Sequence, residues 1–234
     1  MSDKHLSSQF DADLNLVSSK VLEMGGLVES QIVKAMQALN GFDGEIADEV
    51  IAAEERLNTM EVEIDEECSN IIARRQPAAR DLRLLIAISK TITNLERAGD
   101  EAEKIAKRTK RLMEEGSSRN INIAEIKLSG EMAVSILRRA LDAFARLDTV
   151  AAAQIVRDDK AIDEEFRAFV RKLVSYMTED PRTISAGLDF LFIAKAIERI
   201  GDHSKNIAEF IIYIVKGTDV RHKSRDALER EALS

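Results

Sequence analysis

Apolar residues recur every three or four positions along almost the whole chain, the spacing of helices with one buried face. Glycine and proline mark the places where this pattern breaks. The breaks predict six long helices, at about Leu6 to Leu39, Ile46 to the residue before Pro77, Pro77 to Glu115, Ile123 to Leu147, Thr149 to Met177, and Pro181 to Lys216. Asp148 and Asp180 stand where helix N-caps belong.

The turn cluster from Gly116 to Asn120 divides the predicted helices into two sets of three. Short connections within each set imply antiparallel neighbours. The sequence therefore predicts an all-α fold of two tandem antiparallel three-helix bundles, at residues 1–117 and 118–217. Residues 218–234 form a charged C-terminal tail, and we expect its basic cluster (Arg221, His222, Lys223, Arg225) to be a solvated end or to touch a membrane surface.

Composition and charge exclude several functional classes. Aromatic residues make up 4% of the 234 residues and tryptophan is absent, which argues against an all-β protein. The formal net charge of −8, without a segregated basic region, disfavours nucleic acid as a partner. Cys68 is the single cysteine, so neither an intrachain disulfide nor a cysteine-ligated zinc site is expected. The chain has no signal peptide and no apolar stretch of membrane-spanning length, so we expect a soluble cytoplasmic protein.

Two blocks of sequence occur twice in register. Residues 95–106 match residues 197–208 at a spacing of 102, with Glu, Arg, Gly, Asp, Ile and Ala identical. Residues 61–67 match residues 159–165 at a spacing of 98. These matches indicate that the two halves arose by tandem duplication.

Each repeated block carries two acids four positions apart, which places both carboxylates on one helix face. The pairs are Glu61 with Asp65, Glu96 with Asp100, Asp159 with Asp163, and Glu198 with Asp202. Like charges at this spacing destabilise a helix by a few tenths of a kcal/mol, and a hard cation with oxygen ligands would offset that cost. Chance alone places about seven such pairs in a chain this acidic, so a solvated acidic face is the alternative.

The position of the glutamates strengthens the metal interpretation. Glu96 and Glu198 continue the apolar stripes of their helices, where a carboxylate is costly to desolvate unless it is paired or metal-bound. Gly99 and Gly201, at matched sites, suggest close approach of a neighbour or an ion. The arginines that follow the glutamates point about 100° away, so they need other partners. A metal cluster and inter-helix ion pairs both remain open on these grounds.

The same residues resemble a known family. The Glu-Arg-X-Gly-Asp blocks at 96–100 and 198–202, the block Met60–Glu67, Arg74–Ala78, Asp81–Leu85 and Tyr176–Thr183 are similar in order and spacing to the PhoU family of bacterial phosphate-uptake regulators. The resemblance spans Phe10 to Lys216. It implies a cytoplasmic, often dimeric, non-enzymatic protein that restrains the phosphate-starvation response. Its implied partners are the ATPase of the phosphate transporter and the membrane sensor histidine kinase, so membrane contact is indirect.

The resemblance also implies metal ligands and a metal. Family members hold iron or zinc, and in other cases manganese or magnesium, on acid-rich motifs. Carried onto this chain, one site comprises Glu61, Asp65, Glu96 and Asp100, and the other comprises Asp159, Asp163, Glu198, Asp202 and Asn206. Lys104 stands where the family pattern has an asparagine equivalent to Asn206. We therefore expect the Lys104 ammonium to take the cation's place and weaken the first site.

The single cysteine and the one histidine inside the repeat are not predicted to be reactive. We expect His203 to be a surface histidine and Cys68 to be buried filler rather than a nucleophile. A carboxylate-bridged helical oxidase is one alternative, but its Glu-x-x-His pairs are missing, since no glutamate lies three residues before any histidine. The other alternative is a helical adaptor without metal, whose stability would not respond to divalent cations.

Overall fold

The computed structural model describes residues 8–115 and 121–233 and confirms an all-helical fold. The first set comprises α1 (Ser8–Gly41), α2 (Gly44–Arg75) and α3 (Ala79–Glu115). The second set comprises α4 (Ala124–Arg146), α5 (Thr149–Glu179) and α6 (Ile184–Lys216), with a 3-10 turn, η2 (Pro181–Thr183), before α6. A short α7 (Arg225–Leu233) follows. Leu6 and the turn cluster at 116–120, with the boundary predicted there, lie outside the described residues.

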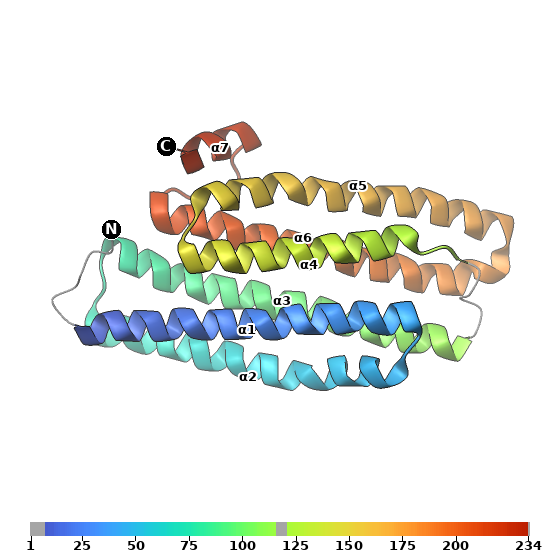
Figure 1. Cartoon of the computed structure of the whole chain (residues 1–234), viewed down its shortest axis with the longest axis horizontal. Coiled ribbons are helices and arrows are strands. Elements are labelled where there is room, and N and C mark those ends of the chain that lie inside the picture. Colours follow the sequence, from blue (N-terminus) through green and yellow to red (C-terminus); the bar gives the residue numbers. More distant parts are fainter. Residues whose placement is uncertain (1–7, 116–120, 234) are drawn as a thin grey trace.

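The six long helices run side by side along the long axis of the molecule (Figure 1). Within each set, every helix contacts the other two. The two sets meet chiefly through α3 and α6, and α1 also contacts α4. Because α3 and α6 pack against helices on several sides, many side chains on both are shielded from water, and charged groups among these need partners.

The helix boundaries follow from local chemistry. Asp148 accepts a hydrogen bond from the Ala151 amide at 2.9 Å, which confirms it as the N-cap of α5. Asp180 caps η2 instead of α6, because its carboxylate accepts from the Arg182 amide and α6 begins only at Ile184. Pro77 lies between α2 and α3, since Gln76 adopts a left-handed conformation that ends α2.

Arg221, His222 and Lys223 of the predicted basic cluster are exposed, as expected of a solvated end, but the tail that carries them also contains a packed helix. Residues 225–233 form α7, which packs on α5. Val220, Leu228 and Ala232 are buried, and the Thr149 hydroxyl donates to the Ala232 carbonyl at 2.8 Å. Charged residues of the tail thus flank an apolar stripe that a reading of charge alone does not reveal. In the described part of the chain, no helix is long and apolar enough to cross a bilayer.

Adjacent glycines in α1 test how tightly the two bundles meet. A methyl group at Gly25 would overlap the side chain of Leu141 on α4, whereas one at Gly26 would meet nothing within 4 Å. Gly25→Ala should destabilise the protein by about 1–3 kcal/mol through overpacking. Gly26→Ala should stabilise it by about 0.5–1 kcal/mol, because alanine favours a helix. Urea denaturation measures both, and equal shifts for the two variants would mean that the bundles are not closely packed there.

Candidate functional site

Three carboxylates from α2 and α3 converge in the first bundle. Oxygen atoms of Glu54, Glu96 and Asp100 all lie within 4.8 Å of one another. Glu96 and Asp100 are the predicted pair on α3, and Glu54 on α2 is a third member that the sequence analysis missed. Oxygen ligands at this spacing suit a hard divalent cation. We call Glu54, Glu96 and Asp100 the first carboxylate site.

Glu54 is the carboxylate of this site whose charge is the least well compensated. Both of its carboxylate oxygens are shielded from solvent, and no donor among the described residues reaches them. Burial raises the pKa of Glu54 to about 7, and the nearby charges of Asp100, Glu103 and Glu96 add to the effect. Burial and the Asp100 charge also raise the pKa of Glu96. Because these carboxylates lie close together, a proton on one of them or a cation between them would relieve the repulsion.

A buried amide lies beside Glu54. Gln31 on α1 is 2% exposed, and neither amide atom finds a hydrogen-bond partner in the described part of the chain. A Cβ at Gly99 would lie 3.1 Å from the Gln31 oxygen and 3.6 Å from a Glu54 oxygen, so the glycine leaves room for both. Unpartnered buried polar groups are costly, so their gathering at one point makes it the candidate site for a polar ligand.

The other two predicted ligands of the first bundle make ordinary hydrogen bonds. Glu61 accepts from the Thr93 hydroxyl at 2.9 Å, and Asp65 accepts from the Ser89 hydroxyl at 2.5 Å. They lie farther along α2, outside the group of three whose oxygens converge. Lys104 does not take the cation's place as expected, because its ammonium contacts Glu101 at 3.0 Å. The predicted reason for a weak first site is therefore wrong.

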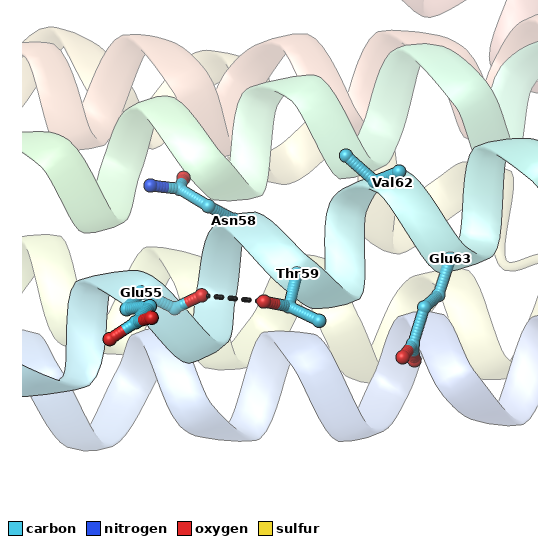
Figure 2. A pocket seen from close by; sticks show the side chains of 5 residues that line it. All are labelled: Glu55, Asn58, Thr59, Val62 and Glu63. Atoms are coloured by element: carbon cyan, nitrogen blue, oxygen red, sulfur yellow. Dashed lines mark hydrogen bonds between the residues drawn. The ribbon is translucent and has the colours of Figure 1, made fainter.

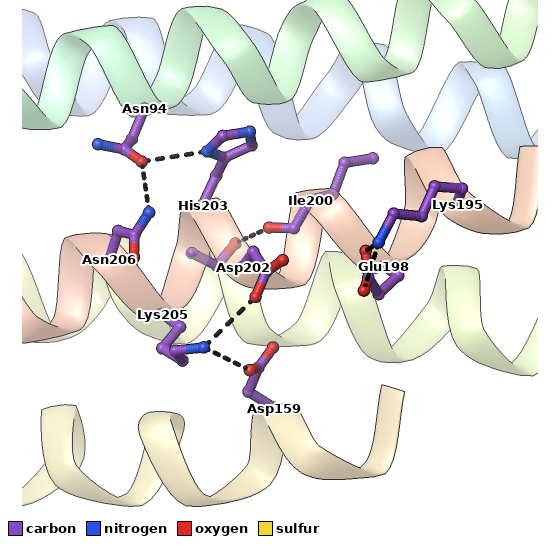
Figure 3. A network of polar contacts seen from close by, with 10 residues as sticks. Asn94, Asp159, Lys195, Glu198, Ile200, Asp202, His203, Lys205 and Asn206 are labelled. Carbon is purple, nitrogen blue, oxygen red and sulfur yellow. Dashed lines mark hydrogen bonds and ion pairs between the residues drawn. The ribbon is translucent and has the colours of Figure 1, made fainter. Parts of the chain in front are cut away.

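In the second bundle a lysine lies between the predicted carboxylates (Figure 3). The Lys205 ammonium is 3.2 Å from Asp159 and 3.3 Å from Asp202. Burial disfavours the charged lysine, but the two carboxylates outweigh it and raise the pKa of Lys205. Burial also raises the pKa of Asp159, which is 3% exposed, against the attraction of Lys205. The positive charge expected in the first bundle is thus found in the second.

The remaining predicted ligands of the second bundle are turned elsewhere. Glu198 contacts the Lys195 ammonium at 2.6 Å, one turn from Asp202 (Figure 3). Asn206 donates to the Asn94 side chain at 3.0 Å, across to the first bundle. Asp163 is half-buried on α5, and its charge adds to the raised pKa of Asp159. The structure does not bring these three side chains together with Asp159 and Asp202.

The two bundles differ because α2 and α5 are related by another register than the sequence match suggests. A Cβ at Gly99 would overlap Leu57, and one at Gly201 would lie 2.9 Å from Asp159. Gly99 and Gly201 are 102 positions apart, and so are the residues that they contact, Leu57 and Asp159. The structure therefore relates α2 to α5 by 102 positions, as it does α3 to α6, and not by 98. In this register Leu57 corresponds to Asp159 and Glu54 corresponds to Val156, so each bundle places its buried acid at a different point. The difference of four residues is one helical turn.

His203 is buried, so the prediction of a surface histidine is wrong. Its Nδ1 lies 3.1 Å from the Asn94 side-chain oxygen, which also accepts from Asn206. Burial lowers the pKa of His203 to about 4, and Arg199 and Arg97 contribute. The neutral imidazole therefore donates to Asn94 and joins α6 to α3. Arg199 pairs with Glu101 of α3 at 3.1 Å, which confirms that this arginine takes a partner other than the glutamate beside it.

Two further features of α2 are a buried thiol and a shallow hollow. Cys68 is buried as predicted, and burial raises its pKa to about 12, so no thiolate forms near neutral pH. A shallow hollow of about 620 Å³ lies over the outer face of the helix, lined by Glu55, Asn58, Thr59, Val62 and Glu63 (Figure 2). The Thr59 hydroxyl bonds back to the Glu55 carbonyl at 2.9 Å, and all five residues come from one helix.

Relatives of known name share the sequence and the fold. The PhoU domain model matches residues 21–109 and 126–211, one match in each bundle. A Burkholderia protein named as a homolog of the phosphate-specific transport system accessory protein PhoU is 62% identical over the whole of both chains. The Escherichia coli K12 protein of that name is 45% identical over 97% of this chain and 94% of its own.

Two solved structures extend the likeness to the backbone. PhoU from Pseudomonas aeruginosa superposes with a TM-score of 0.87 at 48% identity, covering 89% of this chain and all of that one. The phosphate transport system regulatory protein PhoU from Streptococcus pneumoniae gives 0.84 at 28% identity, covering 90% and 99%. Sequence, fold and repeat therefore agree, and this chain belongs to the PhoU family of phosphate transport accessory proteins.

Proposed function

We propose that this protein is a cytoplasmic, non-enzymatic negative regulator that restrains the phosphate-starvation response and modulates high-affinity phosphate uptake. It acts by contact with the ATPase of the phosphate transporter and with the sensor histidine kinase. The observation that carries the proposal is the full-length identity of 62% to a relative named for the phosphate-specific transport system. The homodimer implied by the resemblance stays a prediction.

Deletion of the gene tests the regulatory role. We expect alkaline phosphatase to be expressed in high phosphate in the deletion strain, because the brake on the starvation response is removed. The full chain supplied from a plasmid should restore repression. If phosphatase remained repressed in the deletion strain, the protein would not be a negative regulator, whatever else it binds.

A bound cation at the first carboxylate site is part of the proposal. Family resemblance implies iron, zinc, manganese or magnesium, and the residues present fit a hard cation. Among the residues that the structure describes, no donor reaches the two shielded oxygens of Glu54, the Gln31 amide oxygen has no partner, and like charges gather around them. A divalent ion would neutralise these charges and order the contact between α2 and α3. No such need exists between Asp159 and Asp202, where Lys205 already supplies a positive charge.

The choice between a metal-dependent regulator and a metal-free adaptor rests on this site. In the first, cation binding holds α2 against α3 and so couples the metal to the surfaces that partners meet. In the second, the carboxylates stay protonated or solvated and stability does not respond to divalent ions. The oxidase alternative still lacks the paired histidines that di-iron helical sites use, since His203 is engaged with Asn94.

A further inference from the structure

The contact between α3 and α6 contains the same cation–aromatic pair twice, with the roles exchanged. Lys90 of α3 lies 5.7 Å from the ring centre of Phe210 on α6. The positions related to these two by the repeat spacing of 102 are Phe192 on α6 and Arg108 on α3. The Arg108 guanidinium lies 4.4 Å from the ring centre of Phe192. The two ends of this antiparallel contact are therefore comparable sites.

At the first of these ends the chain covers the pair with its own tail. Arg221, just after α6, lies 6.0 Å from the Phe210 ring centre, and Val220 beside it is 1% exposed. A hydrogen bond from Arg221 lowers the pKa of Asp219 to about 2, and the charge of Lys90 also contributes. The covering segment thus offers a carboxylate to the cations and an apolar side chain to the interior.

At the other end the pair of Arg108 and Phe192 is exposed to solvent. Phe192 is 50% exposed, and Leu188 and Ile184 continue an exposed apolar stripe toward the start of α6. Beside it a hollow of about 320 Å³ is lined entirely by cations of α3: Lys104, Lys107, Arg108 and Arg111. We call Leu188, Phe192, Lys107, Arg108 and Arg111 the basic face.

The charges of this region are sorted by depth. The cations have internal partners, since Arg108 and Arg111 contact Asp189 and Lys107 contacts Glu103. Asp189, however, is 1% exposed at its side chain, whereas Arg111 is 54% exposed. Asp189 and Glu103 lie beneath the cations, whereas Glu115, which contacts Arg111 at 3.4 Å, is an exposed acid at the rim. Solvent in the hollow itself meets the four cations that line it, on a protein whose net charge is −8.

We propose that the basic face binds an acidic segment of a partner protein that also carries apolar side chains. Its carboxylates would meet Lys107 and Arg111, and its apolar residues would cover Leu188 and Phe192. At the related end, the segment with Asp219 and Val220 supplies the same two kinds of side chain beside Lys90 and Phe210. A second copy of this chain is a poor occupant, because a two-fold contact would place like charges together. The proposal rests on the proposed role as a protein-binding regulator and adds the surface and the chemistry of its ligand.

Binding of designed peptides to the full-length protein tests this inference. The probe is a fluorescent synthetic helix of about 18 residues with leucines on one face and glutamates on the other. A matched peptide has lysine in place of every glutamate. We expect the acidic peptide to bind at least about tenfold more tightly than the basic one, and the difference to shrink at high salt.

Matched variants locate the binding surface. Arg111→Glu and Phe192→Ser should each weaken binding of the acidic peptide about tenfold. Arg56→Glu and Val62→Ser, exposed positions on α2, should leave it unchanged. Circular dichroism melts confirm that each variant is folded.

Two kinds of result would overturn the inference. One is binding without the expected specificity, seen either as equal binding of both peptides or as equal effects of Arg111→Glu and Arg56→Glu. The other is recruitment to phosphatidylglycerol vesicles through Phe192 and Arg111 without preference between the peptides, which would make the basic face a membrane contact. Neither result bears on alkaline phosphatase repression, so the regulatory role stands or falls separately.

Discussion

Replacing Lys205 by methionine should destabilise the protein by about 2–4 kcal/mol at pH 7, because it leaves Asp159 buried without a positive partner. Protonation of Asp159 sets the ceiling, since neutralising an aspartate of ordinary pKa at pH 7 costs about 4 kcal/mol. Glu209, whose pKa burial raises to about 7 despite the attraction of Lys205, adds to the loss in the same direction. Urea denaturation of wild type and variant measures the difference.

The pH dependence distinguishes this mechanism from lost packing. In the Lys205→Met variant the pKa of Asp159 rises further in the folded state, above its unfolded value. Stability is then retained below the unfolded pKa near 4 and falls as the pH rises toward the folded pKa. The penalty of the variant should therefore shrink to less than about 2 kcal/mol at pH 5. A penalty that is the same at pH 5 and pH 7 would contradict the charge-based explanation.

A double variant supplies the matched control. The first bundle has Leu57 where the second has Asp159, and both residues lie against a helix glycine. Asp159→Leu together with Lys205→Met therefore copies a packing that the chain already uses. We expect its stability to lie within about 1 kcal/mol of wild type, because replacing a buried ion pair by apolar residues is often neutral or stabilising. A double variant as unstable as Lys205→Met alone would show that the leucine does not fit.

Much of the fold follows from the sequence because its determinants are local. Gly41, Pro77 and Gly217 end or separate helices where they stand, and the aspartate before Thr149 caps α5. The repeat is visible because it preserves whole blocks of residues. By contrast, the burial of His203 and the docking of α7 depend on which surfaces meet across the molecule, and helical periodicity within one segment carries no information about that.

The candidate site is predicted only in part. The sequence does not settle the alignment register of α2 with α5, nor which acids the long lysine side chains contact. Spacings of 98 and 102 between α2 and α5 differ by one helical turn, so both keep the apolar face inward, and sequence identity selects the wrong one. Glu54 escapes notice as a result, although it lies two turns before Glu61 on a similar face. Lys104 and Lys205 are long side chains that reach acids three positions back, and only the surroundings decide which acid is free.

Glu54→Gln should stabilise the metal-free protein by about 1–2 kcal/mol at pH 8 and should have no effect at pH 4. The pKa of Glu54 is raised to about 7 in the folded state, chiefly by burial, so the wild type loses stability as the pH rises from about 4.5 to 7. Glutamine removes the charge, keeps the shape and can donate to Asp100. Because Glu54 is only half-buried as a residue, the full shift is not realised as stability. Glu55→Gln, an exposed neighbour, should leave the pH profile unchanged.

Divalent cations should reverse the order of stability of the wild type and Glu54→Gln. Added Mn²⁺ should raise the melting temperature of the wild type at pH 8, because an ion that binds only the folded state stabilises it by mass action. Glu54→Gln and Asp100→Asn should lose this response, and Asp202→Asn should keep it, since the Lys205 ammonium already pairs with Asp202. Elemental analysis of protein purified without chelator should show the same division. A response lost with Asp202 and kept with Glu54 would place the metal in the second bundle, and no response in any sample would make the protein a metal-free adaptor.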